Sequence, residues 1–392
     1  MNFDFDRITE RKGTNSLKYD FAKERGKGED VLPLWVADMD FPAAPCILER
    51  LDKAVKHGIF GYTDSKEDYF TAVSGWYRER FGWETRESWL VKTPGVVFAI
   101  AMAIRAFTKE GDAVLIQQPV YYPFGQTVKA NNRRLVNSPL KQVNGKYMMD
   151  YGDLEQKIVK EKVKLFVLCS PHNPVGRVWT KEELRRVGDI CLKHHVLVVS
   201  DEIHSDFVYE GHTHHIFASL DEEYADNSII CTAPSKTFNL AGLQISNIFI
   251  PNANIRKQFK RQIDATGYCE VNAMGLFACQ AAYEGGAQWL DELKLYLRGN
   301  LDYIREFLKE KLPEIKLVEP EGTYLVWLDF RGLGLTETQR EELVVKQAKL
   351  WLDSGAMFGP EGEGFERVNI TCPRSVLQRA MEQLEKAVHQ HS

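Results

Sequence analysis

The sequence has no apolar run long enough to cross a membrane. The longest, Val96 to Phe107, is interrupted by Arg105, whereas a membrane-spanning helix needs about 20 mostly apolar residues. The first residues, MNFDFDRITERKG, are charged and lack the apolar segment of a secretory signal. We therefore expect neither a membrane partner nor secretion.

An excess of charge of one sign is also missing. The 392 residues carry 50 Lys and Arg against 55 Asp and Glu, for a net charge of −5, and the basic residues are dispersed. Proteins that bind nucleic acids usually carry a basic patch or stripe. Nucleic acid is therefore not expected as a partner.

The cysteines show no pairing pattern. There are seven of them, an odd number, scattered along the chain and without a Cys-x-x-Cys. Disulfide frameworks and zinc ribbons need paired cysteines, so we expect a reducing compartment, the cytoplasm. The tract His212-Thr213-His214-His215 has no carboxylate or cysteine spaced to complete a ligand set, and no metal is expected.

The length of the chain favours two domains. In its middle, short β-branched runs alternate with helical patterns, which is typical of an α/β fold with a mostly parallel sheet. Beyond about residue 285 the pattern becomes that of a smaller α+β unit. We expect an N-terminal arm (1–45) that joins the small domain, a large domain (46–285) and a small C-terminal domain (286–392).

Several elements are predicted from the pattern of apolar residues. In the large domain, the predicted strands are Ala113–Ile116, Leu165–Cys169, Val196–Val199 and Ser228–Thr232. A helix after Thr180 is predicted from the capping box Thr180-x-x-Glu183. In the small domain we predict a helix over Trp289–Lys311, a strand over Gly322–Leu328, a helix around 336–354 and a last strand over Arg367–Arg374.

Polar residues follow three of the predicted strands. Asn173, Asp201 and Lys236 each come just after a strand's end, in successive units. Ligands of such sheets bind outside the carboxyl ends of the strands. We therefore expect these three side chains to meet at one site.

Lys236 lies in the stretch Ala233-Pro234-Ser235-Lys236-Thr237. For an isolated Ser-Lys pair, a surface turn is the favoured interpretation. The alternative is a lysine kept in a pocket, where it loses its proton and can bond covalently to an aldehyde. Asp201 could then hold the nitrogen of a pyridine ring protonated, and the amide of Asn173 could donate to the ring's phenolic oxygen.

Three further features suit the same chemistry. Gly95-Val96-Val97 begins an apolar helix whose N–H groups could bind a phosphate, Tyr121 could cover a ring, and Arg374 could pair with a substrate carboxylate. Each has an ordinary alternative: a tight turn, a core aromatic residue and a surface arginine. Their joint occurrence at matching strand ends favours the functional interpretation.

Taken together, these features resemble a known family, the pyridoxal-phosphate aminotransferase superfamily, and more narrowly the MalY/PatB type of cystathionine β-lyase. The narrower resemblance rests on the segment Leu34–Pro42 and on Gly61-Tyr62. The motifs that carry the broader resemblance are, in chain order, Pro94-Gly95-Val96, Tyr121-Tyr122-Pro123-Phe124, Asn173-Pro174-Val175-Gly176, Asp201-Glu202-Ile203-His204, Ser235-Lys236-Thr237-Phe238-Asn239-Leu240-Ala241-Gly242 and Arg367-Val368-Asn369-Ile370-Thr371-Cys372-Pro373-Arg374.

The resemblance implies the aminotransferase fold, with a large domain around a mixed, mostly parallel sheet and a smaller α+β domain. It also implies pyridoxal 5'-phosphate as cofactor, Lys236 as the Schiff-base lysine and Asp201 as the partner of the pyridinium nitrogen. Asn173 would bind the phenolic oxygen, and Tyr121 would stack on the ring. The remaining implied cofactor contacts are Gly95, Val96, Val97, Thr232 and Ser235 at the phosphate, with Ile203 and His204 next to Asp201.

Two implied roles involve other molecules. Tyr62 would reach the phosphate of the neighbouring subunit, which implies a homodimer with shared sites. Lys236, or a tyrosine such as Tyr62 or Tyr121, could protonate the leaving sulfur. Arg374 would bind the substrate carboxylate. Trp35 and Asp38 are expected near the substrate's tail, together with Phe358.

The activity implied is that of a carbon–sulfur β-lyase, which converts cystathionine or a related cysteine S-conjugate to a thiol, pyruvate and ammonia. Two departures from the broader aminotransferase pattern favour the lyase branch: Gln244 replaces an arginine that pairs with the phosphate, and His204 replaces a tyrosine. An aminotransferase of class I/II is the alternative. A regulatory or binding protein on the same fold is a further alternative, although every chemical position is filled.

Overall fold

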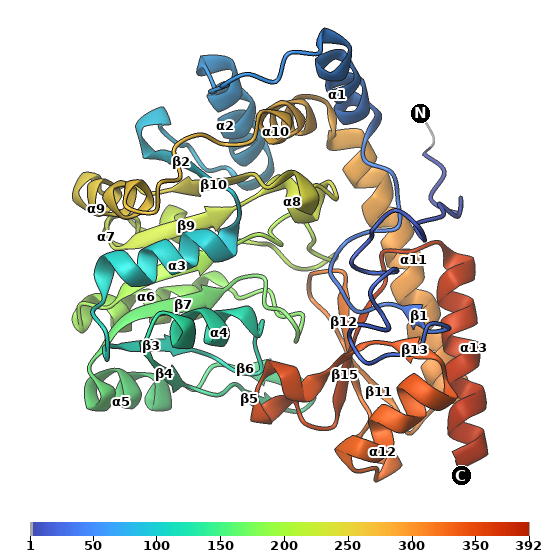
Figure 1. The fold of residues 1–392 in the computed structure, drawn as a ribbon. Helices are drawn as coiled ribbons and strands as arrows, with labels where there is room; N and C mark the ends of the chain where they lie inside the picture. Colours follow the sequence, from blue (N-terminus) through green and yellow to red (C-terminus); the bar gives the residue numbers. More distant parts are fainter. Residues whose placement is uncertain (1–2, 392) are drawn as a thin grey trace.

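The protein is described by a computed structural model that covers residues 3–391. One half of the molecule is built around a seven-stranded sheet with strand order β2-β10-β9-β8-β7-β3-β4 (Figure 1). Strand β10 is antiparallel to both of its neighbours, and the other pairs are parallel. The predicted α/β class with a mixed, mostly parallel sheet is therefore confirmed. The strands are β2 (Leu90–Thr93), β3 (Ala113–Ile116), β4 (Arg134–Asn137), β7 (Val163–Cys169), β8 (Leu197–Asp201), β9 (Ser228–Thr232) and β10 (Ser246–Phe249).

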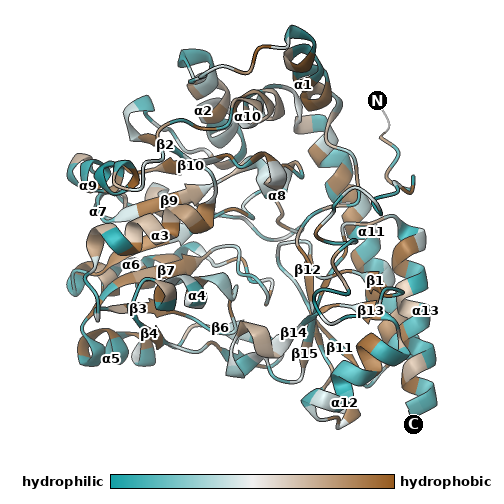
Figure 2. Ribbon diagram, viewed as in Figure 1, coloured by the Kyte–Doolittle hydropathy of each residue, from teal (hydrophilic) through white to brown (hydrophobic). Residues whose placement is uncertain are grey.

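The central strands are apolar on both faces because helices cover both. Every residue of β3, β8 and β9 is buried, as expected for a parallel sheet between two helical layers. Helix α3 (Val96–Phe107) packs on one face against alternate residues such as Val167 and Val199. In Figure 2, α3 and the strands behind it are largely hydrophobic, whereas the outer helices carry hydrophilic surfaces.

Helix α6 (Lys181–Lys193) lies on the opposite face and begins as predicted. Thr180 Oγ1 accepts from the Glu183 N–H, and Glu183 Oε2 accepts from the Thr180 N–H at 2.9 Å. The predicted capping box is confirmed. The other elements of this half are α1 (Pro45–His57), α2 (Glu67–Phe81), α4 (Pro123–Ala130), α5 (Tyr151–Glu161), α7 (Glu222–Asp226), α8 (Pro234–Thr237), α9 (Ala253–Asp264), α10 (Ala273–Gly285) and the hairpin β5 (Lys141–Val143) with β6 (Lys146–Met148).

The other half contains a four-stranded antiparallel sheet of order β11-β12-β15-β14. Its strands are β11 (Lys316–Val318), β12 (Leu325–Asp329), β14 (Asp353–Ser354) and β15 (Phe365–Asn369), and the long helices are α11 (Ala287–Lys311) and α13 (Arg374–His391). Strand β1 (Leu32–Pro33) pairs in parallel with β13 (Leu350–Trp351), so the N-terminal segment joins this half. This pairing agrees with an N-terminal arm that joins the small domain, whereas the boundaries at 45/46 and 285/286 stay a prediction.

Two predicted elements of this half are wrong. The helix expected around 336–354 ends at Gln347, after α12 (Glu337–Glu341) and a π-helical turn, and β13 and β14 follow. The pairing with β1, more than 300 residues away in the chain, overrides the local helical pattern. The strand expected to reach Arg374 ends at Asn369, and Pro373, which has no N–H for a ladder, precedes α13.

None of the helices described is long and apolar enough to serve as a transmembrane segment.

Candidate active site

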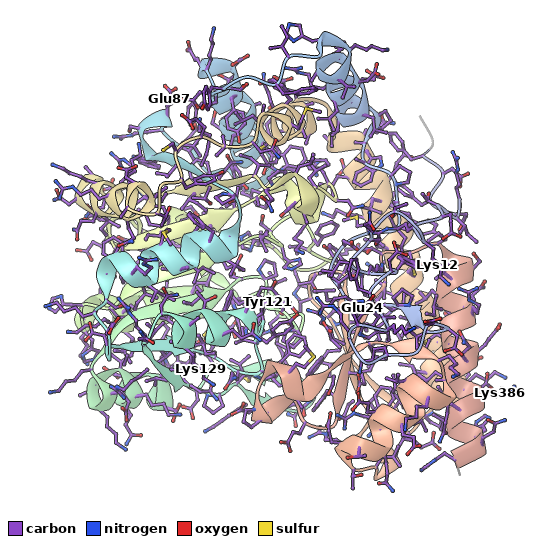
Figure 3. All side chains as sticks on the ribbon, in the orientation of Figure 1. Lys12, Glu24, Glu87, Tyr121, Lys129 and Lys386 are labelled. Carbon is purple, nitrogen blue, oxygen red and sulfur yellow. The ribbon has the colours of Figure 1, made fainter. Side chains whose placement is uncertain are left out.

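A cavity of about 440 Å³ lies at the carboxyl ends of β7, β8 and β9. Tyr121, one of its lining residues, is labelled in Figure 3 near the middle of the molecule, between the two halves. The structure brings Asn173, Asp201 and Lys236 together there, as the strand-end argument predicts. The predicted residues that line the cavity are Gly95, Val96, Val97, Tyr121, Asn173, Asp201, Ile203, His204, Ser235 and Lys236.

Lys236 is carried into the cavity by the short helix α8, which begins at Pro234 directly after β9. Its Nζ donates to the backbone oxygen of Ala37 at 2.7 Å. Burial lowers the pKa of Lys236 to about 8, although the charges of Asp38 and Asp201 oppose this shift. A pKa near 8 leaves part of the amine neutral close to neutral pH, which a nucleophile or a base requires.

Asp201 is the last residue of β8 and is 5% exposed. Burial raises the pKa of its carboxyl to about 7, against the opposing hydrogen bond from the Ile203 N–H and the charge of Lys236. The N–H of Ile203 lies 3.1 Å from Asp201 Oδ1. A cationic N–H group of a ligand in the cavity would hold this carboxyl ionised.

Tyr121 and Asn173 are joined through the backbone. The N–H of Tyr121 donates to the backbone oxygen of Asn173 at 3.0 Å, which fixes the end of the β3 segment against that of β7. The side-chain oxygen of Asn173 accepts from Arg367 at 3.0 Å. The cavity therefore has an aromatic and an amide side chain in fixed positions.

The first turn of α3 forms another wall of the cavity. Gly95 is its N-cap residue, and Val96 and Val97 are its first helical residues. A Cβ added at Gly95 would meet no atom within 4 Å, so the backbone here faces open space. Free N–H groups at the N-terminus of a helix are well suited to bind an anion such as a phosphate.

Arg367 is a functional candidate that the sequence argument missed. It lies in β15, is 2% exposed, and donates from Nη1 to Asn173 and from Nη2 to the backbone oxygen of Trp35 at 2.8 Å. Its Nε is buried and has no hydrogen-bond partner among residues 3–391. The available signal was an arginine at the start of a predicted strand of alternating apolar residues, because a buried arginine needs partners.

The structure does not place Arg374 at the cavity. Its N–H donates to Tyr296 Oη and its Nε to Asn300 Oδ1, both at 2.6 Å, and its guanidinium lies 5.5 Å from the ring centre of Tyr303. These partners all belong to α11. Because β15 ends at Asn369, the candidate for binding a carboxylate is Arg367 rather than Arg374.

Thr232 and Tyr62 also lie outside the cavity of this chain. Thr232 is buried, and its hydroxyl donates to the backbone oxygen of Asn247 in β10 at 2.7 Å, so the structure does not support it as a phosphate ligand. Tyr62 is 96% exposed and lies between α1 and α2. It lines a second hollow together with Gln244, which also lines the cavity.

The residues predicted near the substrate's tail do not line the cavity. Trp35 is buried and contributes its backbone oxygen to Arg367, whereas Phe358 packs against the same guanidinium, 4.9 Å from the ring centre. Asp38 accepts from Arg11 at 2.8 Å. The structure therefore does not bring the side chains of Trp35, Asp38 or Phe358 into the cavity.

Two polar atoms, one on a cavity residue and one on an arginine bonded to the cavity residue Asn173, are buried without a partner within the described part of the chain. One is Arg367 Nε and the other is Nδ1 of His204, whose ring lies 5.5 Å from that of Tyr324. Burial, together with the charges of Lys236 and Arg367, holds the pKa of His204 well below its usual value, so this ring is neutral. Unpaired polar groups beside a cavity indicate a site built for a polar ligand.

The histidine tract takes a structural role. His214 Nε2 lies 2.8 Å from Glu202 Oε2, and both side chains are buried. Within residues 3–391, no cluster of three or more His, Cys, Asp or Glu could hold a metal ion.

Comparisons with known proteins extend over nearly the whole chain. Residues 29–384 match the family described as aminotransferase class I and II. The chain is 44% identical to cystathionine beta-lyase PatB of Bacillus subtilis, over 98% of this chain and 99% of that protein. It is 34% identical to the protein MalY of Escherichia coli, over 98% and 99% of the two chains. Cystalysin from Treponema denticola, whose crystal structure contains a pyridoxal 5'-phosphate cofactor, superposes with a TM-score of 0.97 at 40% identity, over 100% of both chains.

Proposed function

The chain belongs to the aminotransferase class I and II family, and on that premise we propose that it is a pyridoxal phosphate-dependent carbon–sulfur β-lyase. It cleaves cystathionine or a related cysteine S-conjugate to a thiol, pyruvate and ammonia. Full-length similarity to cystathionine beta-lyases of Bacillus subtilis and Corynebacterium glutamicum supports this activity.

The observation that carries the proposal is the environment of Lys236. Lys236 is half-buried, its amine has a pKa lowered to about 8, and it bonds to a backbone oxygen rather than to a carboxylate. It is therefore free to bond covalently to the aldehyde of pyridoxal phosphate. The unpaired Nδ1 of His204 and the open first turn of α3 are consistent with a polar, phosphate-bearing ligand in the same cavity.

The other lining residues would hold the cofactor. Asp201 would pair with its ring nitrogen, Asn173 with its phenolic oxygen, and Tyr121 would cover the ring. The N–H groups of Gly95, Val96 and Val97 would bind the phosphate, with Ser235 beside them. Thr232 is not part of this set, because its hydroxyl is bonded to β10.

When bound, pyridoxal phosphate supplies an electron sink that stabilises negative charge at the substrate's Cα. Lys236 acts as the base that removes the Cα proton, since its Nζ is the basic group of lowered pKa in the cavity. Arg367 pairs with the α-carboxylate and thereby orients the Cα–H bond toward Lys236. The bond between Cβ and sulfur then breaks, the sulfur leaves with the bonding electron pair as a thiolate, and Lys236 returns the proton taken from Cα to it to give the thiol.

We also propose that the enzyme is a homodimer with shared sites. Ile59, Phe60 and Tyr62 are 73%, 64% and 96% exposed and are consecutive or nearly so. An apolar group this exposed suits an interface between copies. In the dimer, Tyr62 would enter the partner's site and approach the phosphate.

Mixing two inactive variants tests the shared site. A Lys236→Ala subunit and a Tyr62→Ala subunit each lack one half of every site in their own homodimers. In a mixed dimer, one of the two sites has both residues intact. After unfolding and refolding an equal mixture, we expect about a quarter of the sites to regain activity, by random pairing of the two subunits. Activity no higher than the average of the separate variants would contradict a shared site.

A reducing compartment is a further proposal. All seven cysteines are free in the structure, and five of them are buried, so none serves as part of a disulfide framework. This pattern is consistent with the cytoplasm.

The experiment that tests the activity is a panel of S-substituted cysteines and cystathionine, assayed for pyruvate and thiol without any added 2-oxo acid. A lyase releases both products in equal amounts under these conditions. If turnover requires a 2-oxo acid as amino-group acceptor, the chain is an aminotransferase and the lyase assignment is wrong.

A further inference from the structure

The guanidinium of Arg367 is bonded to a buried carboxylate, that of Asp353. Asp353 in β14 lies directly opposite Arg367 in β15, and Arg367 Nη2 donates to Asp353 Oδ2. Both side chains are 2–3% exposed. A buried arginine and aspartate bonded to each other form a pair whose geometry is constrained on both sides, because neither group can turn to water.

The donors of Arg367 are divided between two sides. Nη2 donates to Asp353 and to the backbone oxygen of Trp35, so both of its hydrogens are used. Nη1 donates to Asn173, which lines the cavity, and Nε is buried and unpaired within residues 3–391. The guanidinium is thus anchored at Nη2 and retains donor capacity at Nε and Nη1.

We propose that Asp353 is a positioning residue that fixes the guanidinium of Arg367 for the substrate's α-carboxylate. This inference rests on the proposed function, in which Arg367 binds that carboxylate. Asp353 does not line the cavity and lines a separate hollow behind it, with Arg25 and Lys27. It therefore acts through Arg367 alone, by holding a flexible side chain in one orientation before the ligand arrives.

The same strand offers a matched control. Glu366 precedes Arg367 in β15 and points to the opposite face, where its Oε1 accepts from Arg340 Nε at 2.9 Å. Both side chains of this second pair are 2–4% exposed. Glu366 lines the same hollow as Asp353, but none of the hydrogen bonds of Arg367 goes to it, so Glu366→Ala breaks a comparable buried pair without removing a hydrogen bond of Arg367.

The experiment measures ligand binding to the holoenzyme from the change in cofactor absorption. L-alanine carries the α-carboxylate but has no leaving group, whereas ethylamine has the amine alone. Asp353→Ala is expected to raise the dissociation constant of L-alanine about tenfold, the value of one lost hydrogen bond to a charged group, and to leave that of ethylamine unchanged. Asp353→Asn, which keeps an acceptor oxygen, should restore most of the L-alanine affinity.

A second variant keeps the test decisive if Asp353→Ala does not fold. Asp353→Glu keeps the charge but moves the acceptor by one methylene, and we expect it to weaken L-alanine about threefold through misplacement of the guanidinium, again with ethylamine unchanged. Glu366→Ala should leave the ratio of the two dissociation constants at the wild-type value, even where its melting temperature falls as far as that of Asp353→Ala.

The variant Arg367→Lys distinguishes failure of the proposed carboxylate binding by Arg367 from failure of the proposed role of Asp353. If this variant keeps the wild-type preference for L-alanine over ethylamine, Arg367 does not bind the carboxylate and that part of the proposed function is wrong. If Arg367→Lys loses the preference but the folded Asp353 variants keep it, Asp353 is only a structural partner and the inference alone is overturned. Equal weakening of both ligands by the Asp353 variants would also overturn it.

Discussion

Replacing Lys236 by alanine is expected to lower the rate of pyruvate release from a cysteine S-conjugate by at least about 10³-fold, because the variant loses both the covalent anchor of the cofactor and the base at Cα. The steady-state rate with saturating pyridoxal phosphate measures this. The loss should persist with excess cofactor, because added cofactor replaces neither the anchor nor the proton acceptor.

Lys294 provides the control for this variant. It is another lysine whose pKa is lowered by burial, but it lies in α11 and lines a separate hollow that shares no lining residue with the cavity. Lys294→Ala should release pyruvate at a rate close to that of the wild type. If Lys236→Ala retained a comparable rate, the cavity would not be the catalytic site.

Asp201→Asn is expected to lower kcat by about 10²–10³-fold, the usual cost of removing one preorganised electrostatic group from an active site. An amide cannot hold the ring nitrogen of the cofactor protonated, so negative charge at Cα is stabilised less. The KM for the substrate should change far less than kcat, since Asp201 does not contact the α-carboxylate in the proposed arrangement. Steady-state kinetics of the holoenzyme, with bound cofactor quantified by absorption, tests this.

Glu202 is the matched control for Asp201, because it is the next residue and is fully buried. Its carboxylate accepts from Ser200 Oγ and from the Phe217 N–H, both at 2.9 Å, and does not line the cavity. Glu202→Gln should lower the melting temperature and leave kcat nearly unchanged. Equal losses of kcat in the two variants would mean that Asp201 acts through folding rather than through the cofactor.

The site was predictable from the sequence where it depends on single strands. Asn173, Asp201 and Lys236 were located because each follows a buried parallel strand, and parallel strands present their carboxyl ends at one edge. The helix after Thr180 was also predictable, because a capping box depends only on residues within one helical turn. The family predicted from the motifs is confirmed by the match over residues 29–384.

The errors occurred where a distant partner decides the outcome. Thr232 was expected at the phosphate because of the family resemblance, but its hydroxyl donates to the backbone of the neighbouring strand β10. The helix expected around 336–354 gave way to β13, which pairs with residues 32–33. Neither the order of strands nor the partner of a side chain can be inferred from a local pattern.

The sequence by itself determined the α/β class and the meeting of Asn173, Asp201 and Lys236 at one edge of the sheet, because these follow from the pattern of apolar residues and strand ends within short segments. Only the tertiary structure decided which arginine bonds to a cavity residue, since Arg367 donates to Asn173 and Arg374 does not. Arg367 and Arg374 are equally charged and seven residues apart, but β15 ends at Asn369, so Arg367 remains in the sheet beside Asp353 and Asn173 whereas Arg374 starts a helix against α11. Which arginine stays in the sheet therefore depends on where β15 stops pairing with neighbouring segments, and those segments come from three separate parts of the chain.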